Sequence, residues 1–336
     1  MSRAFSSLAA GQRGAALLTA MVIVTLVATL ASAMVWQQWR AVQVEGAERA
    51  RSQAQWILGG AVDWARLILR EDARENQRPN NRVDHLGEPW AVPLAEARLS
   101  SFLAADRDNT DDAPEAFLSG AITDAQSRYN LRRVIDPAGG SRQAEEQVLE
   151  RLFDYAGARS EVLPALLTAL RELGPPAPAV PGVAPATPSA DPALPPQRLD
   201  QLAWLGLDAE TLSLIGPYVT LLPANTTVNV NTASKEVIAA VVPGLDLASA
   251  ERIVSLRQRE PFRSMASLRA QVPAITPQTG VGLDVFSSYF EIRGRLRLLD
   301  RVIEERALVR RTTGSLDIVQ LRRERLAAVE AGSVAR

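Results

Sequence analysis

The feature that most constrains the fold is an uncharged apolar segment near the N-terminus. No charged residue occurs from Gly14 to Trp39, and residues 15–36 read AALLTAMVIVTLVATLASAMVW. As an α-helix this segment is about 33 Å long, close to the thickness of one bilayer core. Arg3 and Arg13 precede it without an acidic residue, which orients the N-terminus toward the cytoplasm. The sequence therefore predicts a single membrane span followed by a domain outside the cytoplasm.

Three interpretations of this segment are open. It is an ordinary signal anchor, or a secretory signal peptide cut after the small-residue box Ala31-Ser32-Ala33. In the third interpretation, a basic leader ends at Gly14 and is removed on the cytoplasmic side, so that the apolar helix is kept and begins at Ala15. The run GQRGAALLT at residues 11–19 favours this last pattern, which is that of type IV prepilins.

The region after the apolar segment favours the prepilin pattern. Few helix breakers occur between Trp36 and Arg70, and apolar residues recur there at helical spacing. We therefore expect one long helix that continues to about Glu71. A released enzyme has no need of such a continuation, whereas a pilin spine has this form.

Composition excludes much familiar chemistry. The 336 residues contain no cysteine, one histidine (His85) and one lysine (Lys235), and the formal net charge is −1. The absence of cysteine excludes disulfides, thiolate metal sites and cysteine nucleophiles. A single histidine excludes a zinc site with paired histidines, and the sequence around the single lysine excludes a P-loop. A near-neutral chain is also a poor candidate for a dedicated nucleic-acid binder.

The middle of the chain predicts a largely helical region. Residues 120–131 predict a strand that leads into a polar turn, and apolar periodicity predicts helices at 143–155, 161–173 and 200–205. Residues 174–196 contain nine of the 21 prolines, which predicts an extended loop.

Residues 228–271 resemble a helix-hairpin-helix or SAM-like unit. Helices are predicted at 235–242, 248–258 and 265–271, with the turn Pro243-Gly244-Leu245 between the first two. The DNA-binding form of this motif needs close backbone approach to phosphate, but Asp246 stands where a second glycine is expected. Residues 229–270 contain six basic and four acidic side chains, so the net charge of this unit is only +2. We therefore expect a packing module rather than a DNA-binding one.

The C-terminal region changes to strand periodicity. Residues 288–298 alternate apolar and charged side chains, and 303–311 and 316–321 are further strand candidates. Together they predict a small antiparallel sheet with one solvent-exposed face.

Taken in order, these segments resemble the K-type minor pseudopilin of bacterial type II secretion, the general secretion pathway protein K family. The resemblance covers nearly the whole chain and rests on residues 13–19, 124–131, 228–234 with Pro243-Gly244, and 287–294. It implies an α+β fold, in which a pilin-like long N-terminal helix and a small antiparallel sheet carry a large α-helical insertion. The implied organisation is a leader (1–14), a spine (15–75), head strands (76–105), a first helical subdomain (106–222), a helix-hairpin-helix subdomain (223–286), C-terminal strands (287–325) and a tail (326–336).

The resemblance also implies a function without catalysis. Prepilin peptidase would cleave between Gly14 and Ala15 and methylate the new N-terminus. The mature protein would sit in the inner membrane, bind the I- and J-type minor pseudopilins and then the H- and G-type ones, and contact the secretion platform and membrane lipid but no nucleic acid. It would cap the tip of the pseudopilus, help to initiate its assembly, and so support export of folded proteins across the outer membrane.

Thr19 supports the K-type assignment. Counted from Ala15 it is the fifth residue of the mature chain, where most pilins carry a glutamate that pairs with a neighbour's N-terminal ammonium. A tip subunit has no neighbour ahead of it, and a buried carboxylate without a partner is expensive. An unremarkable threonine in a membrane helix is the competing interpretation.

Family members also bind calcium in the head. Asp106, Asp108, Asp111 and Asp112 are the best local carboxylate cluster, although the spacing lacks the glycine and the bidentate glutamate of a calcium loop. A solvated acidic turn is the alternative. His85 follows Asp84, but no third catalytic group is visible, so a surface histidine is expected.

Two other functions stay open on the sequence alone. One is a membrane-anchored DNA receptor of the competence type, which would use the hairpin unit. The other is a carboxylate-based hydrolase released after Ala33, whose mature chain would begin at Met34.

Overall fold

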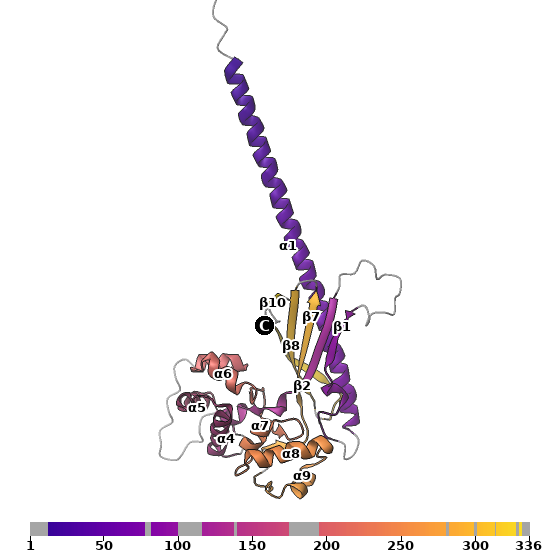
Figure 1. The fold of residues 1–336 in the computed structure, drawn as a ribbon, viewed down its shortest axis with the longest axis vertical. Coiled ribbons are helices and arrows are strands. Elements are labelled where there is room, and N and C mark those ends of the chain that lie inside the picture. The colour runs from indigo at the N-terminus through magenta and orange to yellow at the C-terminus, as the bar shows by residue number, and fades with distance from the viewer. Residues whose placement is uncertain are drawn as a thin grey trace, which may run out of the picture. The chain divides into compact units, whose positions relative to one another are not determined.

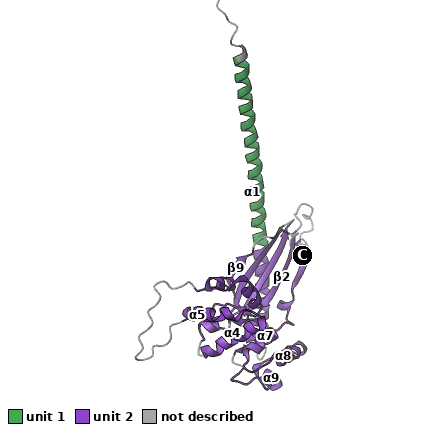
Figure 2. Cartoon of the chain, turned by 60° about the vertical axis from the view of Figure 1, so that its left-hand side comes forward, with its two compact units in different colours: residues 1–57 green, residues 58–336 purple. Residues whose placement is uncertain are grey.

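The computed structural model describes residues 13–77, 82–99, 116–137, 140–174, 195–279, 282–298, 301–312, 314–326 and 329–330. The chain divides into two compact units, residues 1–57 and 58–336 (Figure 2). Helix α1 (Arg13–Glu75) provides the described part of the first unit and continues into the second. The long spine helix is thus confirmed, and it ends one turn beyond the expected Glu71.

The second unit is built on an antiparallel sheet. Its strand order is β1-β2-β7-β8-β10, and β9 pairs with the same edge of β8 as β10 does (Figure 1). The bounds are Leu94–Arg98 for β1, Ala116–Asp124 for β2, Tyr289–Leu298 for β7, Arg301–Arg311 for β8, Ile318–Arg325 for β9 and Val329–Glu330 for β10. The three C-terminal strands predicted from alternation are confirmed.

One face of this sheet packs on the spine helix. The buried spine residues recur at intervals of three and four, so they form a single stripe along the helix. They are Leu58, Val62, Ala65, Leu69 and Ala73. The sheet contributes Ile122, Phe290, Ile292, Ala307 and Val309 to the same hydrophobic core. Trp90 closes its end with an edge-to-face contact on Phe290, with ring centroids 5.2 Å apart.

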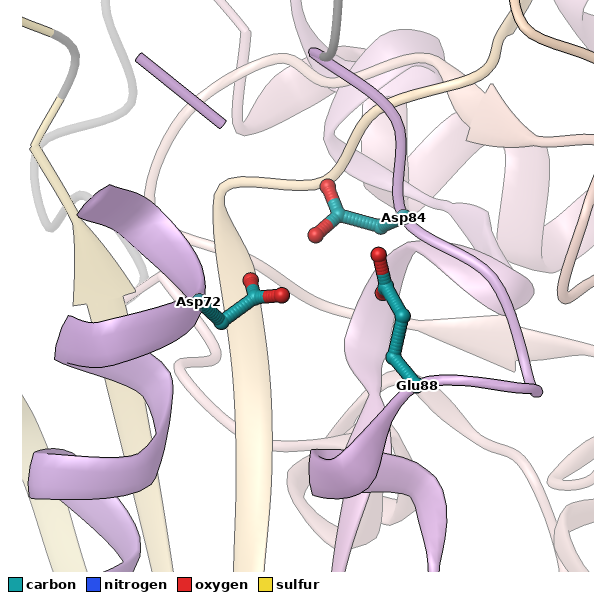
Figure 3. Close-up of side chains that lie close together, drawn as sticks. All are labelled: Asp72, Asp84 and Glu88. Carbon is teal, nitrogen blue, oxygen red and sulfur yellow. The ribbon is translucent and has the colours of Figure 1, made fainter. Parts of the chain in front are cut away.

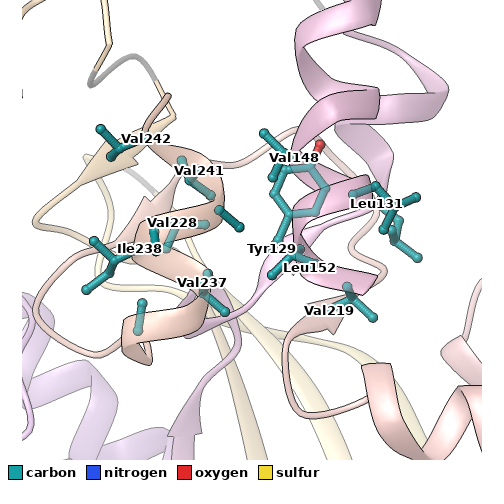
Figure 4. Packing of buried hydrophobic residues seen from close by; sticks show 14 of the residues in the cluster. Tyr129, Leu131, Val148, Leu152, Val219, Val228, Val237, Ile238, Val241 and Val242 are labelled. Carbon is teal, nitrogen blue, oxygen red and sulfur yellow. The ribbon is translucent and has the colours of Figure 1, made fainter. Parts of the chain in front are cut away.

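The chain between β2 and β7 forms a mainly helical insertion with its own core (Figures 1 and 4). Its elements are η2 (Ala125–Ser127), β3 (Tyr129–Asn130), α3 (Arg132–Ile135), α4 (Arg142–Ala156), η3 (Ser160–Val162), α5 (Leu163–Glu172), η4 (Leu199–Leu205), α6 (Ala209–Ile215), β4 (Val219–Thr220), β5 (Val228–Asn229), α7 (Lys235–Val241), α8 (Leu247–Arg259), α9 (Met265–Gln271) and β6 (Leu283–Asp284). Two short parallel pairs, β3–β4 and β5–β6, hold distant parts of it together. The fold is therefore α+β with a helical insertion, as expected.

Local capping explains why the predicted helices begin and end where they do. Ser141, Ser234 and Ser264 each accept a hydrogen bond from the backbone N–H three residues ahead, at the starts of α4, α7 and α9. Gly157 ends α4 with a φ of 63°. The helices predicted at 143–155, 161–173, 235–242, 248–258 and 265–271 are confirmed, whereas 200–205 is a 3₁₀ helix.

One strand of the head sheet lies outside the range expected for head strands. Within the described part of 76–105 there is one sheet strand, β1, preceded by the 3₁₀ turn η1 (Pro89–Ala91). Strand β2 falls in the range given to the first helical subdomain, yet it lies between β1 and β7 in the head sheet. The place of β2 in the head sheet depends on its pairing with β7, a strand more than 160 positions further along the chain. Local sequence does not indicate that pairing. Residues 175–194 of the predicted proline-rich loop lie outside the described residues.

Candidate functional site: apolar spine and buried carboxylates

The N-terminal half of helix α1 is apolar, and its side chains are exposed within the first unit. The helix from Ala15 contains an 18-residue window with a mean hydropathy of 2.3, and none of that window is buried. Gly14 and Ala15 lie in the first turn of the helix. This geometry suits a membrane anchor by length and composition, while cleavage between these two residues stays a prediction.

The hydroxyl groups of this apolar segment are satisfied by the helix itself. Thr19 Oγ1 lies 3.0 Å from the carbonyl oxygen of Ala15 and 2.9 Å from that of Ala16. Thr25, Thr29 and Ser32 donate in the same way to carbonyl oxygens three or four residues back. Polar groups in hydrocarbon need such internal partners, so the segment can enter a bilayer without another chain.

A cluster of three carboxylates lies where the spine helix meets the head. Asp72 comes from the last turns of α1, and Asp84 and Glu88 come from the loop that follows (Figure 3). One carboxylate oxygen from each residue falls within 4.8 Å of the others. By ligand type alone the cluster could hold a hard cation.

Arg311, at the end of β8, already supplies a cation to this cluster. Its Nη1 donates to Asp72, and its Nη2 lies 2.5 and 2.6 Å from the two Asp84 oxygens and 2.7 Å from the Ser287 carbonyl oxygen. The Arg311 and Asp84 side chains are 3% and 0% exposed. The guanidinium also lies over the rings of Phe286 and Phe290. The arrangement is thus a buried ion-pair network that ties spine, loop and sheet together.

Burial shifts the protonation of these acids. Desolvation raises the pKa of Asp72 to about 6 and that of Asp84 as well, while the Arg311 guanidinium opposes both shifts. Glu88 has no guanidinium of its own in the described structure. Desolvation, helped by the charge of Asp72, raises the pKa of Glu88 to about 8, although Glu88 Oε2 accepts hydrogen bonds from Trp90 Nε1 at 2.6 Å and His85 N at 3.0 Å. Glu88 is therefore largely protonated at neutral pH.

A second buried carboxylate, Asp124 at the end of β2, joins the sheet to the helix-hairpin-helix region. Its Oδ2 accepts hydrogen bonds from Thr232 Oγ1 and Ser287 Oγ, both at 2.6 Å, and from Asn229 Nδ2 at 3.0 Å. Its Oδ1 accepts from Gln126 N. Ser287 N also donates to Asp84 at 2.7 Å, so both carboxylates belong to one continuous network. Desolvation raises the pKa of Asp124 to about 6 against these donors.

The residues singled out in the sequence have different fates. Asp106, Asp108, Asp111 and Asp112 lie outside the described residues. His85 is half-buried, its Nδ1 accepts a hydrogen bond from Gly87 N, and burial lowers its pKa, so it serves a local turn. Asp72 and Arg311 carried no recognisable sequence signal, because their partners are far away along the chain. Asp124 and its partners Asn229, Thr232 and Ser287 lie in three of the segments that carry the family resemblance, but nothing in those segments indicated that they meet.

The hairpin unit shows why Asp246 replaces a glycine. Asp246 accepts a hydrogen bond from Ser249 N at 2.7 Å and thereby caps helix α8. Gly244, with a φ of 77°, makes the preceding turn. A capping carboxylate at this end places negative charge where a phosphate would have to approach, which is unfavourable for DNA binding.

Comparisons with known proteins converge on one family. The family model for type II secretion system protein K matches residues 228–286. Type II secretion system protein K of Pseudomonas aeruginosa is 28% identical over 304 residues, covering 87% of this chain and 86% of the relative. Its counterpart from Klebsiella pneumoniae is 28% identical, covering 93% and 96%.

A solved structure agrees in fold. A chain of the GspK–GspI–GspJ complex from the type II secretion system of enterotoxigenic Escherichia coli superposes with a TM-score of 0.61 at 19% identity. The match covers 84% of this chain and 98% of that one. The comparisons confirm the resemblance drawn from the sequence, and they give no support to a DNA receptor.

Proposed function

We propose that this chain, a relative of type II secretion system protein K along nearly its whole length, is a minor pseudopilin that caps the tip of the pseudopilus and helps to initiate its assembly. The observation that carries the proposal is the division of one helix into two halves. The first half is apolar and exposed, and the second half packs on an antiparallel sheet with a helical insertion. This is the construction of a fibre subunit, and the proposed role needs no catalysis.

The apolar half of the spine would anchor the chain in the inner membrane before assembly. The basic side chains of Arg3 and Arg13 favour a cytoplasmic N-terminus and a head in the periplasm. Prepilin peptidase would cut between Gly14 and Ala15 and methylate Ala15. Thr19 fits a tip subunit, because its hydroxyl is satisfied by its own helix and requires no ammonium from a neighbour.

The head half of the spine offers a surface for other subunits. Trp64 and Leu67 are 52% and 62% exposed, and helical spacing places them opposite the stripe that packs on the sheet. Large apolar side chains exposed on one helix face mark contact surfaces. We expect the I- and J-type minor pseudopilins to bind here, as the composition of the GspK–GspI–GspJ complex suggests, with the H- and G-type subunits below and the secretion platform at the membrane.

Calcium binding by Asp106, Asp108, Asp111 and Asp112 is a separate proposal. Carboxylates in a loop are suitable ligands for this cation. Isothermal titration of the purified protein with Ca²⁺, compared with a variant carrying Asn at all four positions, tests it. Equal heats in both proteins would contradict the assignment.

The mass of the complex formed with partner heads tests the main proposal. The protein purified in detergent, mixed with soluble I- and J-type heads, should form a 1:1:1 complex by light scattering and should not polymerise alone. Failure to bind either head, or open-ended homopolymers, would contradict a tip role.

A further inference from the structure

The sheet face that points away from the spine carries a concentration of arginine. Along β7 the even-numbered residues are buried toward the spine, and Glu291, Arg293, Arg295 and Arg297 project from the other face. In Figure 1 the labelled helices of the insertion gather at one end of the sheet. Arg293 and Arg295 are exposed. We call Arg128, Arg293, Arg295, Arg297 and Arg306 the arginine face.

The described glutamates nearby neutralise only part of this charge. Glu291 lies 2.9 Å from Arg128, 2.9 Å from Arg306 and 3.6 Å from Arg293. Glu304 lies 3.3 Å from Arg293, and Glu96 lies 2.7 Å from Arg297. These three glutamates thus form ion pairs with four of the five arginines. A further glutamate, Glu324, lies opposite Arg306 on β9 and is paired with Arg322.

Arg295 is the member without an acidic partner. Although Glu304 stands directly opposite it on β8, the Glu304 carboxylate is engaged with Arg293, and no carboxylate in the described part of the chain reaches the Arg295 guanidinium. This donor-rich group is therefore presented to solvent.

The arrangement holds two arginines side by side around one glutamate, Glu291. Arg293 and Arg306 are direct cross-strand neighbours, and like charges in such positions repel. The chain as a whole is almost neutral, at −1, so the positive charge is concentrated rather than general. A local excess of positive charge of this kind is expected where a partner of opposite charge binds.

We propose that the arginine face forms a second contact, distinct from the spine surface at Trp64 and Leu67, and binds the acidic surface of a partner subunit in the same fibre, an inference that rests on the function proposed above. Guanidinium groups pair with carboxylates through two parallel hydrogen bonds, which fixes orientation as well as affinity. The interleaved Glu291, Glu304 and Glu96 match a protein surface of mixed charge. They would repel the continuous phosphates of a nucleic acid.

Reversing the charge at Arg295, in the full chain purified in detergent, tests this proposal. Arg295→Glu should weaken binding to the I- and J-type heads by about five- to tenfold at low ionic strength, and the difference should shrink above about 0.5 M salt because surface charges are then screened. Arg252→Glu, which reverses an exposed arginine on α8, is the matched control and should bind like the wild type. Arg295→Lys should keep most of the affinity.

The outcomes separate the two proposals. If the wild type binds the heads and Arg295→Glu binds equally well at every salt concentration, the arginine face is overturned while the proposed function stands. If the wild type binds neither head, both fail. If the wild type bound duplex DNA as tightly as the partner heads, and Arg295→Glu lost this DNA binding, the choice of a protein partner would be overturned.

Discussion

Arg311 is the residue on which the junction of spine, loop and sheet depends. It is buried with Asp72 and Asp84, and removal of one partner from a buried ion pair leaves an uncompensated charge. We expect Arg311→Met to lower the free energy of unfolding by about 3–5 kcal/mol. Urea denaturation followed by circular dichroism measures this. Arg310→Met, at the exposed neighbouring position, should cost almost nothing; equal losses in both variants would contradict the role of Arg311.

Glu88 gives the junction a pH dependence of definite sign. Its pKa rises from 4.5 to about 8 on folding, so its favourable contribution is complete below pH 4.5 and is lost as the pH rises through about 8. Glu88→Gln keeps an oxygen acceptor for Trp90 and His85 but cannot ionise. We expect the melting temperature of Glu88→Gln, relative to the wild type, to increase between pH 5 and pH 9 by several degrees.

Glu71→Gln is the control for this measurement, because Glu71 is exposed on the spine. Its melting temperature should follow that of the wild type over the same pH range. A difference between Glu88→Gln and the wild type that is independent of pH would show that Glu88 is not protonated on folding.

At the scale of elements, the spine helix and the sheet meet through a glycine. A Cβ on Gly294 of β7 would come within 3.2 Å of Leu58 Cδ2. Gly294→Leu should therefore push the helix off the sheet and cost about 1–3 kcal/mol. Gly60→Leu is the control, since its Cβ would meet nothing within 4 Å. Similar unfolding midpoints for the two variants would contradict close packing at Gly294.

The start of the spine carries the processing prediction. A β-branched side chain at the residue before the cut should prevent cleavage, so Gly14→Val is expected to leave full-length precursor in the membrane. Intact mass and N-terminal sequencing of the wild type should give a mature chain that starts at Ala15. A start at Met34 would instead indicate a signal peptide.

At the scale of the whole molecule, the exposed face of the spine should decide assembly without affecting folding. Leu67→Glu puts a charge into the proposed contact surface and should weaken binding of the I- and J-type heads by about tenfold or more. Its unfolding midpoint should stay near that of the wild type. Trp204→Glu changes an equally exposed apolar residue of the insertion and should leave binding intact. A stronger effect at Trp204 would move the contact surface to the insertion.

The sequence by itself determined the parts whose energetics are local. The uncharged run at 15–36, the capped helices of the hairpin unit and the alternating C-terminal strands each follow from spacing within a few residues. Their order along the chain was sufficient to indicate the family. These signals survive because helix caps, hydrophobic stripes and strand alternation act between near neighbours.

Only the tertiary structure decided how these parts are joined. Strand β2 enters the sheet through pairs such as Ile122 with Ile292, and Arg311 reaches Asp72 across 239 positions of sequence. Register and buried ion pairs depend on which surfaces come together after folding, so neither leaves a periodic trace in the sequence. For the same reason Asp84 could be noticed beside His85, while its actual partner, Arg311, could not.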